Sequence, residues 1–160
     1  MIFGNKLENI ELAISLLKKH GIKIIKKSSF YETLSQPNTH DPKFLNIVIS
    51  VNTNLKPIDL LNLLISIEKK LGRVRNKKNS PRTCDLDIID FDGKIIELEF
   101  EGQKLTLPHS RLFERNFVLY PLREISSNWS HPLLKKTVND LISELNLNNN
   151  QITKLSENDI

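Results

Sequence analysis

Two segments of the chain carry apolar residues at helical spacing and therefore predict amphipathic helices. The first, residues 5–20, begins at Asn5, which suits an N-cap, and is followed by Gly21, which suits a helix end. Its inward positions are Leu7, Ile10, Ala13, Ile14 and Leu17. The second, residues 57–71, begins at Pro57 and stops before Gly72. Its apolar face is formed by Leu60, Leu61, Leu64, Ile67 and Leu71.

Strand patterns fill the segments between and after these helices. Residues 22–33 and 43–53 are rich in β-branched and aromatic types and predict two neighbouring strands. After the second helix, residues 83–91 (TCDLDIIDF) alternate polar and apolar positions as a strand does. Gly93 then indicates a turn into further short strands within residues 94–107. The predicted order is helix, strand, strand, helix, strand.

The last third of the chain predicts two shorter helices, over residues 116–125 and 137–145. The second of these turns Val138, Leu141, Ile142 and Leu145 inward. The Asn-rich residues 146–160 are predicted to form a loose tail. Since a chain of 160 residues suits one core, residues 1–145 are predicted to form a single domain.

The composition is that of an ordinary globular protein, with 39% hydrophobic residues, 23 basic and 19 acidic residues. No apolar run approaches the roughly 20 residues of a membrane-spanning helix. We therefore expect no membrane association and a cytoplasmic location. Cys84 is the only cysteine, so no internal disulfide is expected.

A run of basic residues without any acidic residue begins in the last turn of the second predicted helix and continues beyond it. It consists of Lys69, Lys70, Arg73, Arg75, Lys77, Lys78 and Arg82. Such a run attracts phosphate groups, although a solvated loop explains a lysine-rich turn equally well.

The predicted strand 83–91 places two acids on one face. Because alternate side chains of a strand point the same way, Asp85 and Asp87 would project together, roughly 7 Å apart. Two carboxylates in this arrangement, with substrate phosphates and water, could hold one or two magnesium ions. They could equally serve to keep an edge strand soluble. The neighbouring Arg73, Arg75 and Arg82, whose planar donors match phosphate oxygens, favour a phosphate site.

Glycine-rich phosphate loops are missing from the sequence. It has five glycines and contains neither GxxxxGK[ST] nor GxGxxG. Phosphates would therefore be held by basic side chains and metal. Further along, His109, Arg111 and Arg115 lie within seven residues and could contribute, although a histidine after proline is more often a turn residue.

The strings PRTCDLDIIDFDG and LPHSRLFERNFVLYPLREI resemble the signature of the 6-hydroxymethyl-7,8-dihydropterin pyrophosphokinase family. The resemblance extends through SSFYET, DPKFLNIVISVNTNL and IEKKLGRVR, and covers about residues 4–126. It implies a ferredoxin-like α+β fold and the transfer of pyrophosphate from ATP to a reduced pterin in folate biosynthesis, with release of AMP. It further implies two magnesium ions and small-molecule partners only, on a chain that we expect to be a monomer.

The resemblance also implies a role for each matching residue. The two metal ligands are Asp85 and Asp87, which with Arg73 and Arg82 make up the catalytic set. The nucleotide side comprises Glu68, Arg75, His109 and Arg115. The pterin side comprises Thr33, Phe44, Asn46 and Phe117. Stacking between two rings and an amide at the ring edge suit a flat heteroaromatic substrate. Without the resemblance, Phe44 and Phe117 would be interpreted as core residues.

The start of the chain departs from the family pattern. The family opens with a strand and a Gly-Ser-Asn turn, whereas GNKLENIELA matches only the tail of that turn. The first strand of the expected sheet is therefore predicted to be missing. Either the true protein starts upstream of Met1, or this form has impaired activity.

Two other functions compete with a pyrophosphokinase. One is a basic, ferredoxin-like module that binds nucleic acid, but neither candidate strand has the paired aromatics of an RNA-binding sheet, and Asp85 and Asp87 would repel a phosphate backbone. The other is a truncated, non-catalytic relative that still binds ATP or pterin.

Overall fold

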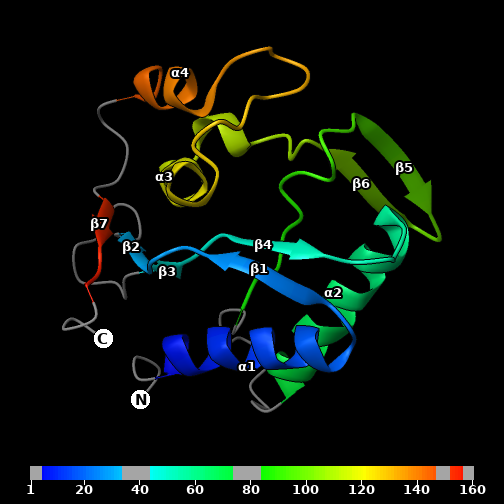
Figure 1. The fold of residues 1–160 in the computed structure, drawn as a ribbon. Coiled ribbons are helices and arrows are strands. Elements are labelled where there is room, and N and C mark those ends of the chain that lie inside the picture. The colour runs from blue at the N-terminus through cyan, green and yellow to red at the C-terminus, as the bar shows by residue number, and fades with distance from the viewer. Residues whose placement is uncertain (1–4, 34–43, 74–83, 147–151, 157–160) are drawn as a thin grey trace.

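The computed structural model describes residues 5–33, 44–73, 84–146 and 152–156. These segments form a mixed α+β arrangement with three small antiparallel sheets. The two long helices, α1 (Asn5–Lys19) and α2 (Pro57–Arg73), lie on one side of the central strands, and α3 (Asn116–Ile125) and α4 (Val138–Ser143) lie on the other (Figure 1). All four predicted helices are confirmed, with ends that differ by a few residues from those predicted. None of the helices in the described ranges is both long and apolar enough to cross a membrane.

The central strands form one long antiparallel ribbon with an interruption in the middle. At one end β1 (Lys23–Lys27) pairs with β4 (Ile49–Asn52), and at the other β2 (Tyr31–Thr33) pairs with β3 (Phe44–Asn46). At the interruption, the Ser28 amide donates to the Val48 carbonyl and the Val48 amide donates to Ser28 Oγ, each at 3.0 Å. The two predicted strands are thus confirmed, each divided where the Ser28 side chain replaces a ladder bond.

A third strand occupies the other edge of β2. Residues Ile152–Lys154 form β7, with Thr153 opposite Glu32. They fall within the segment expected to be a loose tail, and the unpaired backbone of the β2 edge gives them donors and acceptors to bind.

The strand predicted over residues 83–91 is wrong for the part that the structure describes, since residues 84–90 form no ladder. The alternation itself is present: Asp85 and Asp87 are exposed, whereas Cys84, Leu86 and Ile88 pack against the core beneath α1 and α2. Alternation reports burial on one face and does not require a neighbouring strand. This extended segment is held instead by bonds to the Glu68 side chain and the His109 backbone.

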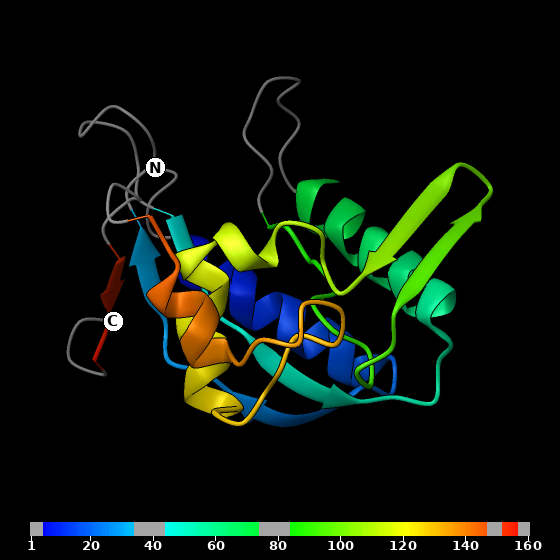
Figure 2. The same ribbon diagram turned by 90° about the horizontal axis from the view of Figure 1, so that it is seen from above.

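The short strands predicted within residues 94–107 are confirmed as a hairpin of β5 (Ile96–Phe100) and β6 (Gln103–Leu107). Its turn residues Glu101 and Gly102 have φ of 49° and 79°, which matches the twist required of a two-residue hairpin loop. The turn of the hairpin extends past α2 at the edge of the molecule (Figure 2).

Two groups of buried side chains hold these elements together. One joins α1 and α2 to the ribbon and contains Ala13, Leu17, Ile22, Leu60, Leu64, Ile67 and Leu71. The other joins α3 and α4 and contains Leu112, Val118, Leu119, Leu122, Val138 and Leu141. The ribbon therefore lies between two separate apolar clusters.

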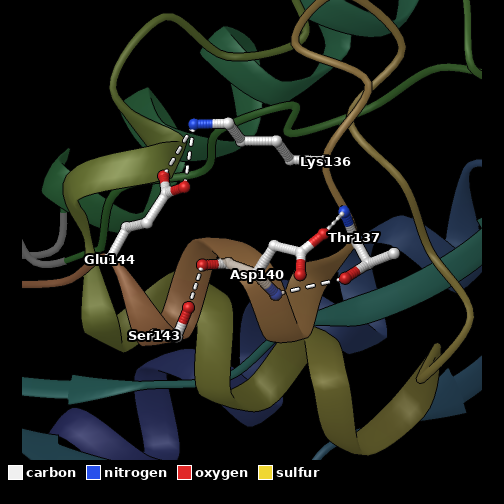
Figure 3. Close-up of polar contacts among 5 residues, drawn as sticks. All are labelled: Lys136, Thr137, Asp140, Ser143 and Glu144. Carbon is white, nitrogen blue, oxygen red and sulfur yellow. Dashed lines mark hydrogen bonds and ion pairs between the residues drawn. The ribbon is translucent and has the colours of Figure 1, made fainter.

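Polar contacts fix the short helix α4 at both ends (Figure 3). The Asp140 amide donates to Thr137 Oγ1 at 3.1 Å, and the Thr137 amide donates to Asp140 Oδ2 at 3.0 Å, which is a capping box. Near the C-terminal end, Lys136 Nζ donates to both carboxylate oxygens of Glu144, at 2.8 and 2.9 Å.

Replacing Thr137 with alanine should lower the free energy of unfolding by about 1 kcal/mol, because the Asp140 amide at the helix start loses its acceptor. Urea denaturation measures the change. Ser127→Ala, in an exposed turn, is the control and should stay within about 0.5 kcal/mol of the unmodified protein. Equal stability of both variants would contradict a role for the cap.

Candidate functional site

The two candidate metal ligands lie on the outer side of the extended segment 84–90. Asp85 is exposed and the Asp87 side chain is 51% exposed, so both carboxylates are open to a ligand. Between them, the Leu86 amide donates to Glu68 Oε1 on α2 at 2.7 Å. Glu68 was expected on the nucleotide side, and the structure adds that its carboxylate anchors the backbone of the acidic segment.

Glu68→Ala should therefore destabilise the protein by about 1–3 kcal/mol, because the part-buried Leu86 amide would lose this acceptor. Glu68→Gln keeps an acceptor oxygen and should lose less. Chemical denaturation of the two variants, side by side, measures the difference. A glutamine variant as unstable as the alanine variant would contradict this anchoring role.

Arg115 connects the acidic segment to an aromatic ring. Its Nη1 lies 3.9 Å from Asp87 Oδ2, and its Cζ lies 5.5 Å from the centre of the Phe117 ring. The Arg115 side chain is only 22% exposed. Because it directly precedes α3, the turn that starts this helix fixes its position. One carboxylate, one guanidinium and one ring from the candidate set are therefore brought together.

His109 joins the same group through its backbone and its charge environment. Its amide donates to the Ile89 carbonyl at 2.9 Å, which ties it to the end of the acidic segment. Burial lowers the pKa of His109, although the Asp87 carboxylate acts in the opposite direction. Nδ1 accepts from the Arg111 amide at 3.1 Å, which leaves the proton of the neutral ring on Nε2. The ring can thus donate one hydrogen bond to a phosphate oxygen.

The chemistry of the donors fits magnesium better than a softer metal. No group of three or more His, Cys, Asp and Glu side chains suited to a metal occurs among the residues that the structure describes. Two exposed carboxylates alone suit a hard cation that completes its shell with substrate phosphates and water. Cys84 is not a competing ligand, since burial, with the charges of Asp85 and Glu68, raises its pKa to about 11.

The pterin-side candidates lie on the β2–β3 pair and at the start of α3. Thr33 is directly opposite Phe44, and Asn46 is opposite Tyr31. Phe44 is 56% exposed, so the alternative that it is a core residue does not hold. Phe117 is half-buried and packs against the α3–α4 cluster, as does Val48, two residues after Asn46. Phe117, at the start of α3, and Val48, in the interruption between β3 and β4, thus contact the same apolar cluster.

The side-chain positions of three predicted basic residues are not described by the structure. Arg75 and Arg82 lie outside the described residues, and for Arg73, the last residue of α2, only the backbone is described. Their roles remain predictions.

One residue of interest was missed from the sequence. Glu124, in the last turn of α3, accepts hydrogen bonds from the Ser29 amide and from Tyr31 Oη. A carboxylate near a helix C-terminus interacts unfavourably with the helix dipole. This was the one signal in the sequence that Glu124 has a role other than stabilising its own helix.

The sequence of the chain is similar to those of known proteins. Residues 2–127 match the model of the 7,8-dihydro-6-hydroxymethylpterin-pyrophosphokinase family. The chain is 41% identical over 123 residues to the 2-amino-4-hydroxy-6-hydroxymethyldihydropteridine pyrophosphokinase of Bacillus subtilis, covering 76% of this chain and 71% of that protein. It is 36% identical over 143 residues to the protein of the same name from Synechocystis, covering 89% and 71%.

Longer relatives contain the same region as one part. The chain is 36% identical over 143 residues to the folic acid synthesis protein fol1 of Schizosaccharomyces pombe, covering 89% of this chain but 19% of that protein. It spans 25% of the folate synthesis bifunctional protein of Arabidopsis thaliana, at 43% identity over 123 residues. The family model covers most of the chain, including the acidic segment, His109, Arg115 and Phe117, and the chain therefore belongs to the 7,8-dihydro-6-hydroxymethylpterin-pyrophosphokinase family.

Proposed function

We propose that this chain transfers pyrophosphate from ATP to the hydroxymethyl group of 6-hydroxymethyl-7,8-dihydropterin, a step of folate biosynthesis, and releases AMP. The observation that carries the proposal is the contact of Arg115 with both Asp87 and Phe117. A carboxylate, a guanidinium and an aromatic ring lie side by side there, which supports the proposal that they bind a divalent cation, a phosphate and the pterin. Membership of the family supports the same reaction.

The reaction is a displacement at the β-phosphorus of ATP. The pterin hydroxyl oxygen forms a bond to this phosphorus, and the bond from the phosphorus to the oxygen that bridges the α- and β-phosphates breaks. AMP leaves with that oxygen, and the hydroxyl proton passes to water. No covalent intermediate on the protein is required.

Asp85 and Asp87 are the proposed ligands of two magnesium ions, which when bound would neutralise charge on the phosphate oxygens. Arg115 is proposed to hold a phosphate group of ATP with its planar donors, while its partial burial keeps it in place. His109 donates from Nε2 to the nucleotide. Arg73, Arg75 and Arg82 are proposed to bind the remaining phosphates, and Glu68 to keep the acidic segment in position from the nucleotide side.

The proposed pterin site lies between Phe44 and Phe117, which sandwich the ring. Asn46 reads the ring edge with its amide, and Thr33 adds a contact from β2. Phe44 is 56% exposed although Lys6 Nζ lies 5.8 Å from the centre of its ring, and this exposure supports a role in stacking.

We also propose that the fold is ferredoxin-like, with residues 1–145 as one domain, to which β7 adds a strand at the β2 edge. The antiparallel ribbon with α1 and α2 on one side supports this topology (Figure 1). We further propose that the chain is a monomer, that it is located in the cytoplasm and that it binds no nucleic acid.

Product analysis tests the proposed function. Purified protein, ATP, magnesium and 6-hydroxymethyl-7,8-dihydropterin should yield AMP and the pterin diphosphate in equal amounts, as separated by anion-exchange chromatography. Formation of ADP, or of neither product, would contradict the proposal.

A further inference from the structure

The C-terminal end of α3 carries a carboxylate that binds three other parts of the chain. Glu124 Oε2 accepts from the Ser29 amide at 2.6 Å, in the interruption between β1 and β2. Glu124 Oε1 accepts from Tyr31 Oη on β2 at 2.9 Å and lies 3.2 Å from Lys154 Nζ on β7. One side chain therefore links a helix to three points around β2.

These bonds are of a kind that fixes geometry. Each involves an ionised acceptor, and such bonds are shorter and stronger than bonds between neutral groups. Burial pushes the pKa of Glu124 up, but the hydrogen bonds from Ser29, Tyr31 and Lys154 outweigh this, so the pKa lies below its usual value. Burial, with the bond to Glu124, raises the pKa of Tyr31 to about 12. Both groups thus keep their donor and acceptor roles at neutral pH.

The presence of the Glu124 carboxylate at this position is not explained by stabilisation of α3. In the last turn of α3, a negative charge faces the negative end of the helix dipole. The same helix end is held by Lys26 Nζ, which donates to the Ile125 carbonyl at 3.3 Å. The contacts of Glu124 and Lys26 together attach the end of α3 to the ribbon around residues 26–31.

The attached elements are those that carry the proposed pterin residues. Thr33 lies on β2, Phe44 and Asn46 lie on β3 in register with it, and Phe117 lies on α3. The Glu124 contacts therefore join the helix that carries Phe117 to β2, the strand that carries Thr33 and pairs with β3. The Asp87–Arg115 pair lies near the start of the same helix.

We propose that Glu124 is a positioning residue for pterin, which sets the gap between α3 and the β2–β3 pair without touching the substrate. The proposal rests on the function proposed above and adds a residue to it. It requires that loss of the carboxylate weaken pterin binding much more than ATP binding.

Isothermal titration calorimetry of the full chain, in buffer that contains magnesium, tests this requirement. In one titration the ligand is an ATP analogue with a methylene α–β bridge. In the other the ligand is the pterin, and the analogue is already present. Glu124→Ala should raise the pterin Kd by about tenfold and leave the analogue Kd within about twofold. Glu124→Gln should fall between, since its oxygen can still accept from the Ser29 amide and its NH2 can donate to Tyr31. Tyr31→Phe should show the same selectivity with a smaller effect.

Glu144→Ala is the matched control, because it removes a carboxylate that binds Lys136, just before α4, and no residue of the ribbon is among the contacts drawn (Figure 3). It should change neither Kd. A Glu124→Ala protein that binds pterin as the unmodified protein does, or loses analogue and pterin affinity equally, would overturn the inference alone. An unmodified protein that binds no pterin would overturn the proposed function as well.

Discussion

Replacing Asp87 with asparagine is expected to lower kcat for AMP formation by about 100-fold or more. The substitution removes one negative charge from the pair that is proposed to hold the cations, and electrostatic stabilisation of this kind is worth several kcal/mol in phosphoryl transfer. It also removes the ion-pair partner of Arg115, 3.9 Å away. Steady-state assays of AMP at saturating ATP and pterin measure the effect.

Asp92→Asn provides the matched control for this prediction. Asp92 lies in the exposed turn before β5 with a φ of 53°, a conformation that asparagine also adopts readily. Its kcat should stay within about twofold of the unmodified protein, as expected for a surface substitution away from the site. The account is wrong if Asp87→Asn retains most of its activity, or if Asp92→Asn loses as much.

Arg115→Ala is expected to reduce kcat/KM by about 10²–10³-fold, comparable to the loss of a donor that stabilises charge in the transition state. The side chain lies between Asp87 and the Phe117 ring, so its removal affects the phosphate side and the pterin side together. Arg115→Lys should recover only a small part, because an ammonium group neither stacks flat on a ring nor offers paired donors.

Arg123→Ala is the control on the same helix. The Arg123 guanidinium lies over the Tyr120 ring at 5.1 Å, so the variant loses a similar cation–ring contact about two turns from Arg115. Near-normal kcat/KM is expected. Equal losses in the Arg115 and Arg123 variants would indicate a general effect on α3 and would contradict a specific role for Arg115.

The helices were predictable from sequence because burial of one helix face places apolar residues at a regular spacing along the chain. This spacing can be recognised without knowing which element packs against that face. Pro57 and the residues before Gly21 marked their ends correctly to within a few positions. The paired strands were predictable because their segments are rich in the β-branched and aromatic residues that strands favour. The break at Ser28 was not, because it depends on a side-chain bond to Val48 across the ribbon.

The extended segment 84–90 shows where the sequence pattern is insufficient. Alternation correctly predicted that Asp85 and Asp87 share the exposed side, which is the feature that the chemistry needs. It could not reveal that the segment lacks a strand ladder, because alternation records which face is buried and contains no information on hydrogen-bond partners. The bond from the Leu86 amide to Glu68 joins residues from separate elements and has no local signature.

The candidate site was predicted in outline through the family resemblance. The contacts of Arg115 join Asp87 and Phe117, two of the predicted residues, and His109 lies in the same electrostatic environment. Glu124 and β7 were not anticipated, since both act through contacts between segments distant along the chain. A charged residue that interacts unfavourably with the dipole of its own helix, as Glu124 does, is a sign in the sequence of such a contact.

Nucleic-acid binding would give a different response to the same substitution. If the chain bound RNA through its basic residues, Asp87→Ala would remove a repulsive charge and strengthen binding. The pyrophosphokinase account predicts no detectable RNA binding by either protein in a filter-binding assay at 150 mM salt. Binding that improves in the variant would favour the nucleic-acid module.

Asp85 and Asp87 are proposed to hold the divalent cations against the triphosphate. Titration with Mn²⁺, followed by electron paramagnetic resonance in the presence of the methylene-bridged ATP analogue, tests this proposal directly. The unmodified protein should bind two ions per chain, and the Asp85→Asn, Asp87→Asn double variant should bind none beyond those held by the free analogue. Equal manganese binding by the two proteins would contradict the account.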